Sequence, residues 1–115
     1  MGIELIDYSQ TYEIKHSTGA VFTVRHWTCA MQDEVNRCCL SIDQESKTAK
    51  FDHTLEREML IEMSVVGWSG ITVNSQEVPC DSENKKKLPM AVAIWLQSQI
   101  EERAGLRFTP EEKKN

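Results

Sequence analysis

The sequence predicts an α+β fold, in which a small antiparallel N-terminal β-hairpin or sheet is followed by three main helices. Residues 11–27 alternate in polarity and are rich in β-branched and aromatic side chains, which is typical of strands. After Met31 the apolar positions recur with the period of a helix. The chain has 115 residues, and a hydrophobic share of 40% suits one core. We therefore expect a single α+β domain over residues 1–108 and a charged, frayed tail over residues 109–115.

The first predicted element is a β-hairpin. Its strands are residues 11–16 and 20–27, joined by a Ser-Thr-Gly loop at 17–19. The late glycine of this loop can adopt the left-handed backbone that closes a short hairpin. Ile3 and Leu5 also alternate with polar residues, so they are candidates for a third strand at the edge of the sheet.

A stripe of apolar residues predicts the first helix, and the hydroxyl of Thr28 is placed to cap its N-terminus. The stripe consists of Met31, Val35, Cys38, Cys39 and Ile42. We expect the helix to end near Asp43, where the polar loop DQESKTAK begins.

The second predicted helix begins near Asp52 or Thr54 and runs to Val66, with Gly67 as the residue that ends it. It has two apolar sides. One side carries Leu55, Met59, Met63 and Val66, and the nearly opposite side carries Ile61 and Val65. A helix of this kind either lies inside the domain or offers its second side to a partner. Ile61 and Val65 are therefore candidate partner-binding residues.

A long connection, VVGWSGITVNSQEVPCDSEN, is predicted at residues 65–84, with Trp68 between two glycines and a turn at Asn74-Ser75. The indole of Trp68 either packs into its own domain and orders this connection, or anchors an interface, where tryptophan is enriched. We expect the ring to be mostly buried and to hold the connection against the helices. The interface alternative keeps Trp68 among the candidate partner-binding residues.

Two further helices complete the predicted fold. A short one at residues 83–87 follows Asp81 and Ser82, either of which can cap it. Pro89 then suits the first turn of a longer helix that ends at Gly105. The residues that share one face of this helix are Leu88, Val92, Trp95, Leu96 and Gln99.

The composition excludes several classes of protein. Thirteen basic residues stand against 18 acidic ones, a formal net charge of -5, whereas nucleic-acid binders gain affinity from basic side chains that neutralise phosphates. No apolar stretch is long enough to cross a membrane, and residues 1–7 carry acids where a secretory leader would carry cations. We expect a cytoplasmic protein that binds neither nucleic acid nor membrane.

The sequence contains no pattern that indicates catalysis or a cofactor. Its four cysteines, Cys29, Cys38, Cys39 and Cys80, have neither disulfide-scaffold nor zinc-site spacing, so we expect free, mostly buried thiols and no metal. Ser69 lacks the strand-to-helix turn of a nucleophile elbow. His53 with Glu56 and Glu62 is better explained as a solvated helix face, as is the run of lysines at 85–87. We expect no catalytic residue, although a small enzyme or regulator with an unrecognised site remains open.

Residues 51–106 resemble the tail assembly chaperones and related small tail-assembly proteins of long-tailed bacteriophages. The resemblance rests on a helix that ends in VVGWSGI, a turn, a proline, and SEN opening a helix that resumes at LPMAVAIWLQSQI. Cys80 stands where that family more often has an aromatic residue, and Asn74-Ser75 replaces an Asp-Gly turn.

The resemblance implies a non-catalytic phage or prophage protein in the cytoplasm of a bacterial host. Such a protein would self-associate, bind the tape-measure protein, keep it soluble and help to recruit tail-tube subunits. A structural tail or head-completion component is the alternative within phage assembly.

Overall fold

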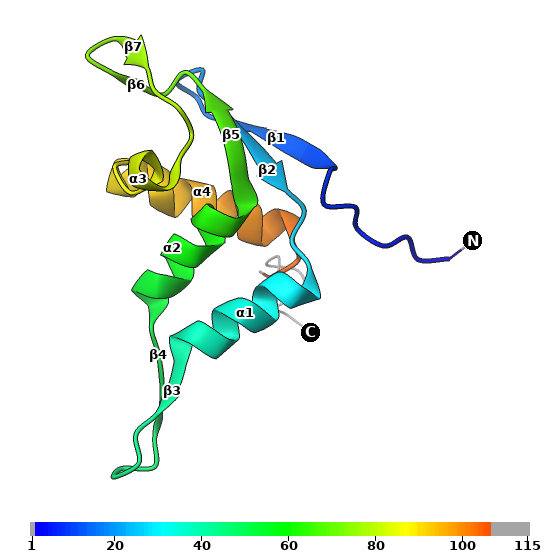
Figure 1. Cartoon of the computed structure of the whole chain (residues 1–115), viewed down its shortest axis with the longest axis vertical. Helices are drawn as coiled ribbons and strands as arrows, with labels where there is room; N and C mark the ends of the chain where they lie inside the picture. The colour runs from blue at the N-terminus through cyan, green and yellow to red at the C-terminus, as the bar shows by residue number, and fades with distance from the viewer. Residues whose placement is uncertain (1, 107–115) are drawn as a thin grey trace, which may run out of the picture.

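The computed structural model describes residues 2–106 and confirms the predicted α+β class (Figure 1). A three-stranded antiparallel sheet has the order β1-β2-β5, with β1 at Thr11–Lys15, β2 at Val21–Arg25 and β5 at Val65–Ser69. The helices are α1 (Cys29–Cys39), α2 (His53–Ser64), α3 (Ser82–Lys85) and α4 (Met90–Arg103). Two small hairpins pair β3 (Leu40–Ile42) with β4 (Ala49–Phe51) and β6 (Thr72–Val73) with β7 (Gln76–Glu77). The tail predicted at 109–115 lies outside the described residues.

The predicted N-terminal hairpin is confirmed. Strands β1 and β2 pair antiparallel from Thr11 opposite Arg25 to Lys15 opposite Val21. Gly19 has a φ of 98°, so the loop uses the left-handed conformation that glycine adopts without a Cβ clash.

The third strand of the sheet comes from a different part of the chain than the sequence predicts. Residues 2–10 form no strand, and the side chains of Ile3 and Leu5 are 96% and 92% exposed. Strand β5 takes the free edge of β2 instead, with Phe22 opposite Trp68. The prediction of an edge strand at Ile3 and Leu5 is therefore wrong.

Helix α2 ends earlier than predicted because the chain enters β5 directly. Its last residue is Ser64, and Val65 already has an extended backbone, with φ −82° and ψ 113°. Gly67 lies within β5, opposite Thr23, and does not end a helix. The predicted connection at 65–69 is thus a strand, in keeping with the β-branched and aromatic side chains of this segment.

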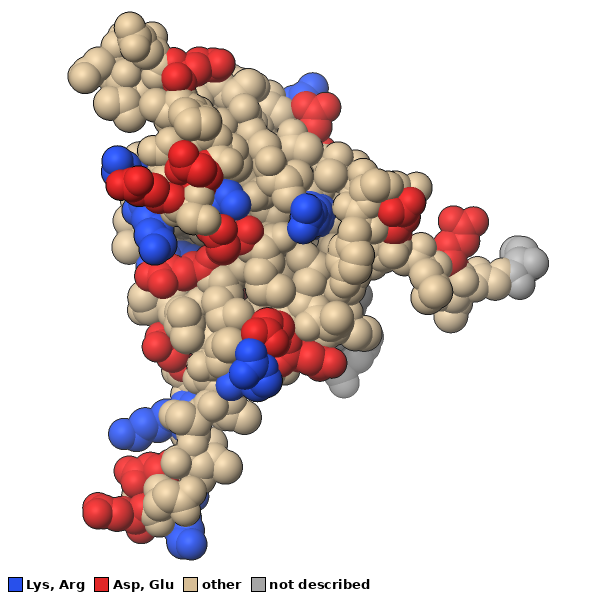
Figure 2. All heavy atoms as spheres, in the orientation of Figure 1, with Lys and Arg blue, Asp and Glu red and all other residues tan. Residues whose placement is uncertain are grey.

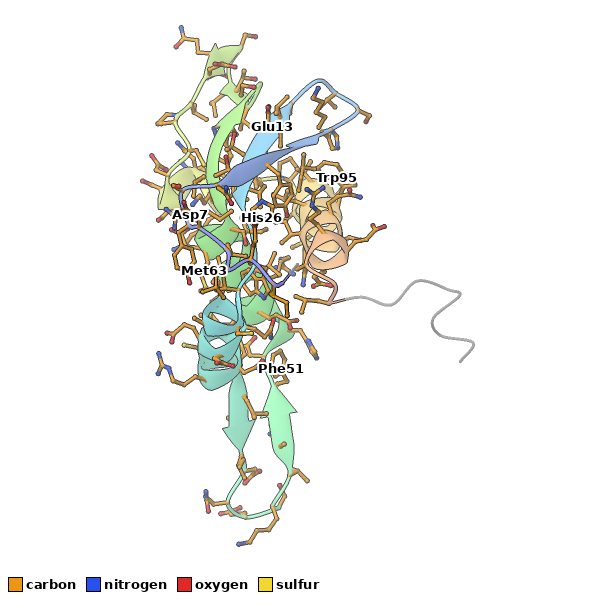
Figure 3. All side chains as sticks on the ribbon, turned by 90° about the vertical axis from the view of Figure 1, so that its right-hand side faces the viewer. Asp7, Glu13, His26, Phe51, Met63 and Trp95 are labelled. Carbon is orange, nitrogen blue, oxygen red and sulfur yellow. The ribbon has the colours of Figure 1, made fainter. Side chains whose placement is uncertain are left out.

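The core lies between the sheet and helices α2 and α4. Phe22 and Val24 of β2 are fully buried there, as are Leu96 and Ile100 of α4. The rest of this cluster is Ile14, Ala20, Leu60, Ile61, Val65 and Ala93. Figure 3 shows α4, which carries Trp95, beside the sheet. Helix α4 therefore covers one face of the sheet, as expected of an α+β domain.

Helix α1 packs against α2 and then leads into a projecting hairpin. The Thr28 hydroxyl accepts a hydrogen bond from the N–H of Met31 at 3.3 Å, which confirms the predicted cap. The helix ends at Cys39, four residues before the predicted end, and Ile42 lies in β3 with 63% of its side chain exposed. The β3–β4 hairpin extends away from the body in Figures 1 and 3, so no core contact holds these residues in a helix.

The short helix α3 forms where the sequence predicts one. The carboxylate of Asp81 accepts a hydrogen bond from the N–H of Asn84 at 2.8 Å, so Asp81 is the capping residue. Gly105, with a φ of 76°, follows the end of α4 as predicted. No helix within residues 2–106 has the length and apolar character needed to cross a membrane.

Candidate partner-binding groove

An open groove of about 500 Å³ lies between α2, α3 and the start of α4. Its apolar lining is Leu55, Met59, Ile61, Met63, Leu88, Met90 and Ala93. Its polar lining is Arg57, Glu58, Glu62, Ser82, Lys85 and Lys86. An apolar floor with a charged rim is the usual anatomy of a site that binds another protein.

Ile61 and Val65 take the first of the two predicted alternatives and lie inside the domain, with exposed fractions of 5% and 0%. Val65 is therefore not available to a partner, whereas Ile61 contributes to the lining of the groove from its buried position. Val65 is carried into the sheet opposite Val24 because α2 continues directly into β5. Met59 and Met63, on the other side, line the groove.

Three methionines give the groove its adaptable surface. Met59 and Met63 come from α2, and Met90 comes from the first turn of α4, where 58% of its side chain is exposed. An unbranched thioether side chain changes shape at little cost and is polarisable, so it packs against varied apolar partners. The groove is therefore suited to a partner whose apolar side chains vary along its length.

A set of polar contacts holds α3 against the end of α2 and forms one wall of the groove. The Ser82 hydroxyl donates to a carboxylate oxygen of Glu62 at 2.5 Å. The Lys85 ammonium donates to the main-chain carbonyl of Glu62 at 3.2 Å and lies 3.8 Å from its carboxylate. A cation near the last carbonyls of a helix also suits the helix dipole.

The rim of the groove is weakly basic. It carries Arg57, Lys85 and Lys86 against Glu58 and Glu62, so three cations face two acids. Figure 2 shows basic and acidic side chains side by side over α2 and α3. Because Glu62 is engaged by Lys85, the cations of Arg57 and Lys86 remain opposite a single acid.

Trp68 lies outside this groove. Its side chain is partly buried, its ring lies edge-on to that of Phe22 with centroids 6.3 Å apart, and its indole N–H donates to the carbonyl of Val78 at 2.8 Å. The prediction that the ring packs within its own domain and holds the following connection is confirmed. The ring packs on strand β2, however, where the sequence suggested helices.

The sequence indicates no binding site at the groove methionines. Met59 and Met63 belong to an apolar stripe, and such a stripe alone does not reveal which side of a helix meets the core. A usable signal is present in the composition of the two sides, since flexible methionines mark one and the β-branched Ile61 and Val65 mark the other.

Of the polar groups considered for chemistry, the structure brings His53 and Glu56 together at the surface. His53 is 3.4 Å from Glu56, at the exposed start of α2. Ser69 is exposed on β5, and Glu62 is engaged by α3. Within residues 2–106 no group of three or more histidine, cysteine, aspartate and glutamate side chains is arranged to hold a metal ion.

The four cysteines are free, as predicted. The prediction that they are mostly buried is wrong, because two of them are exposed. Cys39 alone is fully buried, and burial raises the pKa of its thiol. Cys80 is half-buried, and burial raises the pKa of its thiol as well. Cys29 and Cys38 are exposed, Cys29 as the first residue of α1 and Cys38 in its last turn.

None of the protein-family models, curated proteins or solved structures compared with this chain matches it. The resemblance over residues 51–106 is therefore supported by the sequence motifs of this chain alone. The groove is the structural feature from which a function can be argued.

Proposed function

We propose that this protein is a tail-assembly chaperone of a long-tailed phage or prophage, which binds the tape-measure protein and carries out no chemistry. The observation that supports the proposal best is the methionine-lined groove. All of its lining residues, from Leu55 to Ala93, lie within the stretch 51–106 that resembles this family. The feature suited to binding and the resemblance thus come from the same part of the chain.

The proposed occupant of the groove is an amphipathic helix of the tape-measure protein. A groove between helices, with an apolar floor and charged edges, receives the apolar face of such a helix. Arg57 and Lys86 on the rim favour acidic residues at the flanks of that face. Covering apolar segments before assembly would keep a long partner protein soluble.

Co-expression with the tape-measure protein of the same phage tests the proposal. The parent chain should increase the soluble fraction of the tape-measure protein and co-purify with it. Met59→Glu and Met63→Glu should abolish both effects, because a carboxylate on the groove floor loses its hydration without gaining a partner. Far-ultraviolet circular dichroism should show that both variants remain folded.

Ile94→Glu is the matched control. Ile94 is an apolar helix residue that is 54% exposed and lies outside the groove lining, so its substitution should leave co-purification unchanged. Groove variants that co-purify as well as the parent would contradict the proposal. Recovery of the chain in stoichiometric amounts from purified tails would instead favour the structural-component alternative.

A further inference from the structure

Residues 2–6 form an apolar arm that projects from the body next to the sheet (Figure 1). Ile3 and Leu5 are almost completely exposed, and Ile6 is 42% exposed. Isolated apolar side chains are common on protein surfaces, but three exposed ones within four consecutive residues concentrate apolar area in one short segment. Such a surface indicates an interaction site.

The base of the arm is held in place. The Tyr8 hydroxyl and the Thr28 hydroxyl are hydrogen-bonded at 3.1 Å. The Asp7 carboxylate accepts hydrogen bonds from the N–H and the hydroxyl of Ser9, at 2.9 Å and 2.8 Å, and these bonds hold the pKa of Asp7 below its usual value. The Gln10 N–H closes the turn on the carbonyl of Asp7 at 2.9 Å. The body of the protein therefore sets the direction in which the arm leaves.

The sheet has a free edge immediately after this turn. The His16 N–H donates to the carbonyl of Ala20 at 2.8 Å, so the main-chain groups of His16 point toward β2. In an antiparallel ladder the direction alternates along the strand, so the main-chain groups of Ile14 and Tyr12 also point toward β2. Those of Thr11, Glu13 and Lys15 point to the outer edge, and all three residues are exposed. This edge can accept another extended strand.

We propose that the arm of one copy of this chain adds to the β1 edge of a second copy, and that the exchange is reciprocal. Strand β1 has five residues, which is about 17 Å of extended chain, and residues 2–6 are enough to run along all of it. Because the arm and the edge belong to the same chain, a two-fold axis produces both contacts at once and closes the assembly as a dimer.

Charge permits this pairing. The arm carries Glu4, and Asp7 lies at its base. The exposed charged side chains of the β1 edge are Glu13 and Lys15, one of each sign. The edge therefore has no net charge, and the Lys15 ammonium offers the acidic arm a partner of opposite sign.

The exchange divides the area that a stable interface requires among four surfaces. Stable interfaces bury about 1,200–2,000 Å² in total. A reciprocal exchange has two arms and two edges, so each of the four surfaces needs to bury only about 300–500 Å². The inference does not depend on the proposed function, because it uses none of the groove residues.

Sedimentation equilibrium of the full chain over a range of concentrations tests the proposal. The parent should form a dimer whose population rises with concentration. The double variant Ile3→Asp with Leu5→Asp should weaken association by about tenfold or more, since it removes two exposed apolar anchors. Glu13→Pro should do the same, because proline removes the outward N–H and leaves the pairing of β1 with β2 intact.

Mixing these variants gives a sharper result. The arm variant keeps an intact β1 edge, and the Glu13→Pro variant keeps an intact arm, so an equimolar mixture can re-form one of the two exchanges. The mixture should associate more strongly than either variant alone. Ile42→Asp on β3 is the matched control, because it removes an apolar side chain that is 63% exposed elsewhere and should not change association. A parent that stays monomeric at every concentration, or a dimer unaffected by the arm variant, would overturn the inference.

Discussion

The indole N–H of Trp68 donates a 2.8 Å hydrogen bond to the main-chain carbonyl of Val78, ten residues further along the chain. The same ring lies edge-on to Phe22 in the core. One side chain therefore joins β5 to the segment that follows the β6–β7 hairpin. The groove wall formed by α3 begins only four residues after Val78, so the position of that wall depends in part on this contact.

Trp68→Ala should lower the free energy of unfolding by about 3 kcal/mol, near the lower end for a buried tryptophan because the ring is only partly buried. Trp68→Phe keeps an aromatic ring against Phe22 and loses the hydrogen bond, which should cost about 0.5–1.5 kcal/mol beyond the loss of ring area. Urea unfolding followed by circular dichroism measures both values. If Trp68→Ala unfolds at the urea concentration of the parent but fails to bind a partner, the ring acts as an interface anchor.

A second prediction compares the two sides of α2. Ile61→Ala should destabilise the domain by about 2–5 kcal/mol, since it opens a cavity in a close-packed core. Met59→Ala should cost less, because Met59 lines an open groove where water can replace the lost side chain. Thermal unfolding of the two variants checks the order. Equal losses would show that the groove is closed in solution.

Some parts of this fold can be predicted from local sequence, and others depend on distant parts of the chain. The β1–β2 hairpin is predictable because its alternation and its loop glycine are adjacent in the chain. The caps at Thr28 and Asp81 are predictable for the same reason, since each bonds an N–H three residues away. Each of these features depends on interactions within a few residues.

The roles of Ile61 and Val65 depend on distant parts of the chain. Val65 is a strand residue because β2, more than 40 residues earlier in the sequence, offers an edge opposite Val24. Ile61 then faces the core because α2 must enter that strand in a fixed orientation. The groove that Met59 and Met63 line follows from the same orientation of α2, and periodicity alone contains no information about it.

A third prediction concerns Ser64, which is fully buried where α2 meets β5. Its hydroxyl has no hydrogen-bond partner among residues 2–106, and an unsatisfied buried hydroxyl is destabilising. Ser64→Ala should therefore leave the melting temperature unchanged or raise it, while the larger Ser64→Leu should lower it by overpacking. A clear loss of stability in Ser64→Ala would mean that the hydroxyl has a bound water or another partner in solution.

The last prediction is that Ser75→Gly stabilises the β6–β7 hairpin. Asn74 and Ser75 form its two-residue loop, and both have positive φ angles, 52° and 66°, which is the geometry of a type I′ turn. A residue with a Cβ in this region loses about 1–2 kcal/mol, and glycine avoids that cost but loses more backbone entropy, about 0.5–1 kcal/mol. The net gain in hairpin stability should be about 0.5–1 kcal/mol. The Val78 N–H donates to the carbonyl of Ile71 at the foot of the hairpin, so its exchange with solvent reports on opening of the hairpin. In Ser75→Gly this exchange should slow by about two- to fivefold.

Gly70→Ala is the opposing control for this turn. Gly70 has a φ of 78°, and a Cβ there would lie 3.0 Å from the Cα of Ala20, so alanine is both strained and crowded against main chain that cannot easily move. The same Val78 amide hydrogen should exchange faster in Gly70→Ala than in the parent, since Gly70 begins the segment that leads into the hairpin. An amide that exchanges equally fast in Ser75→Gly and in the parent would mean that the loop leaves its left-handed conformation in solution. The asparagine-serine turn would then carry no strain for glycine to relieve.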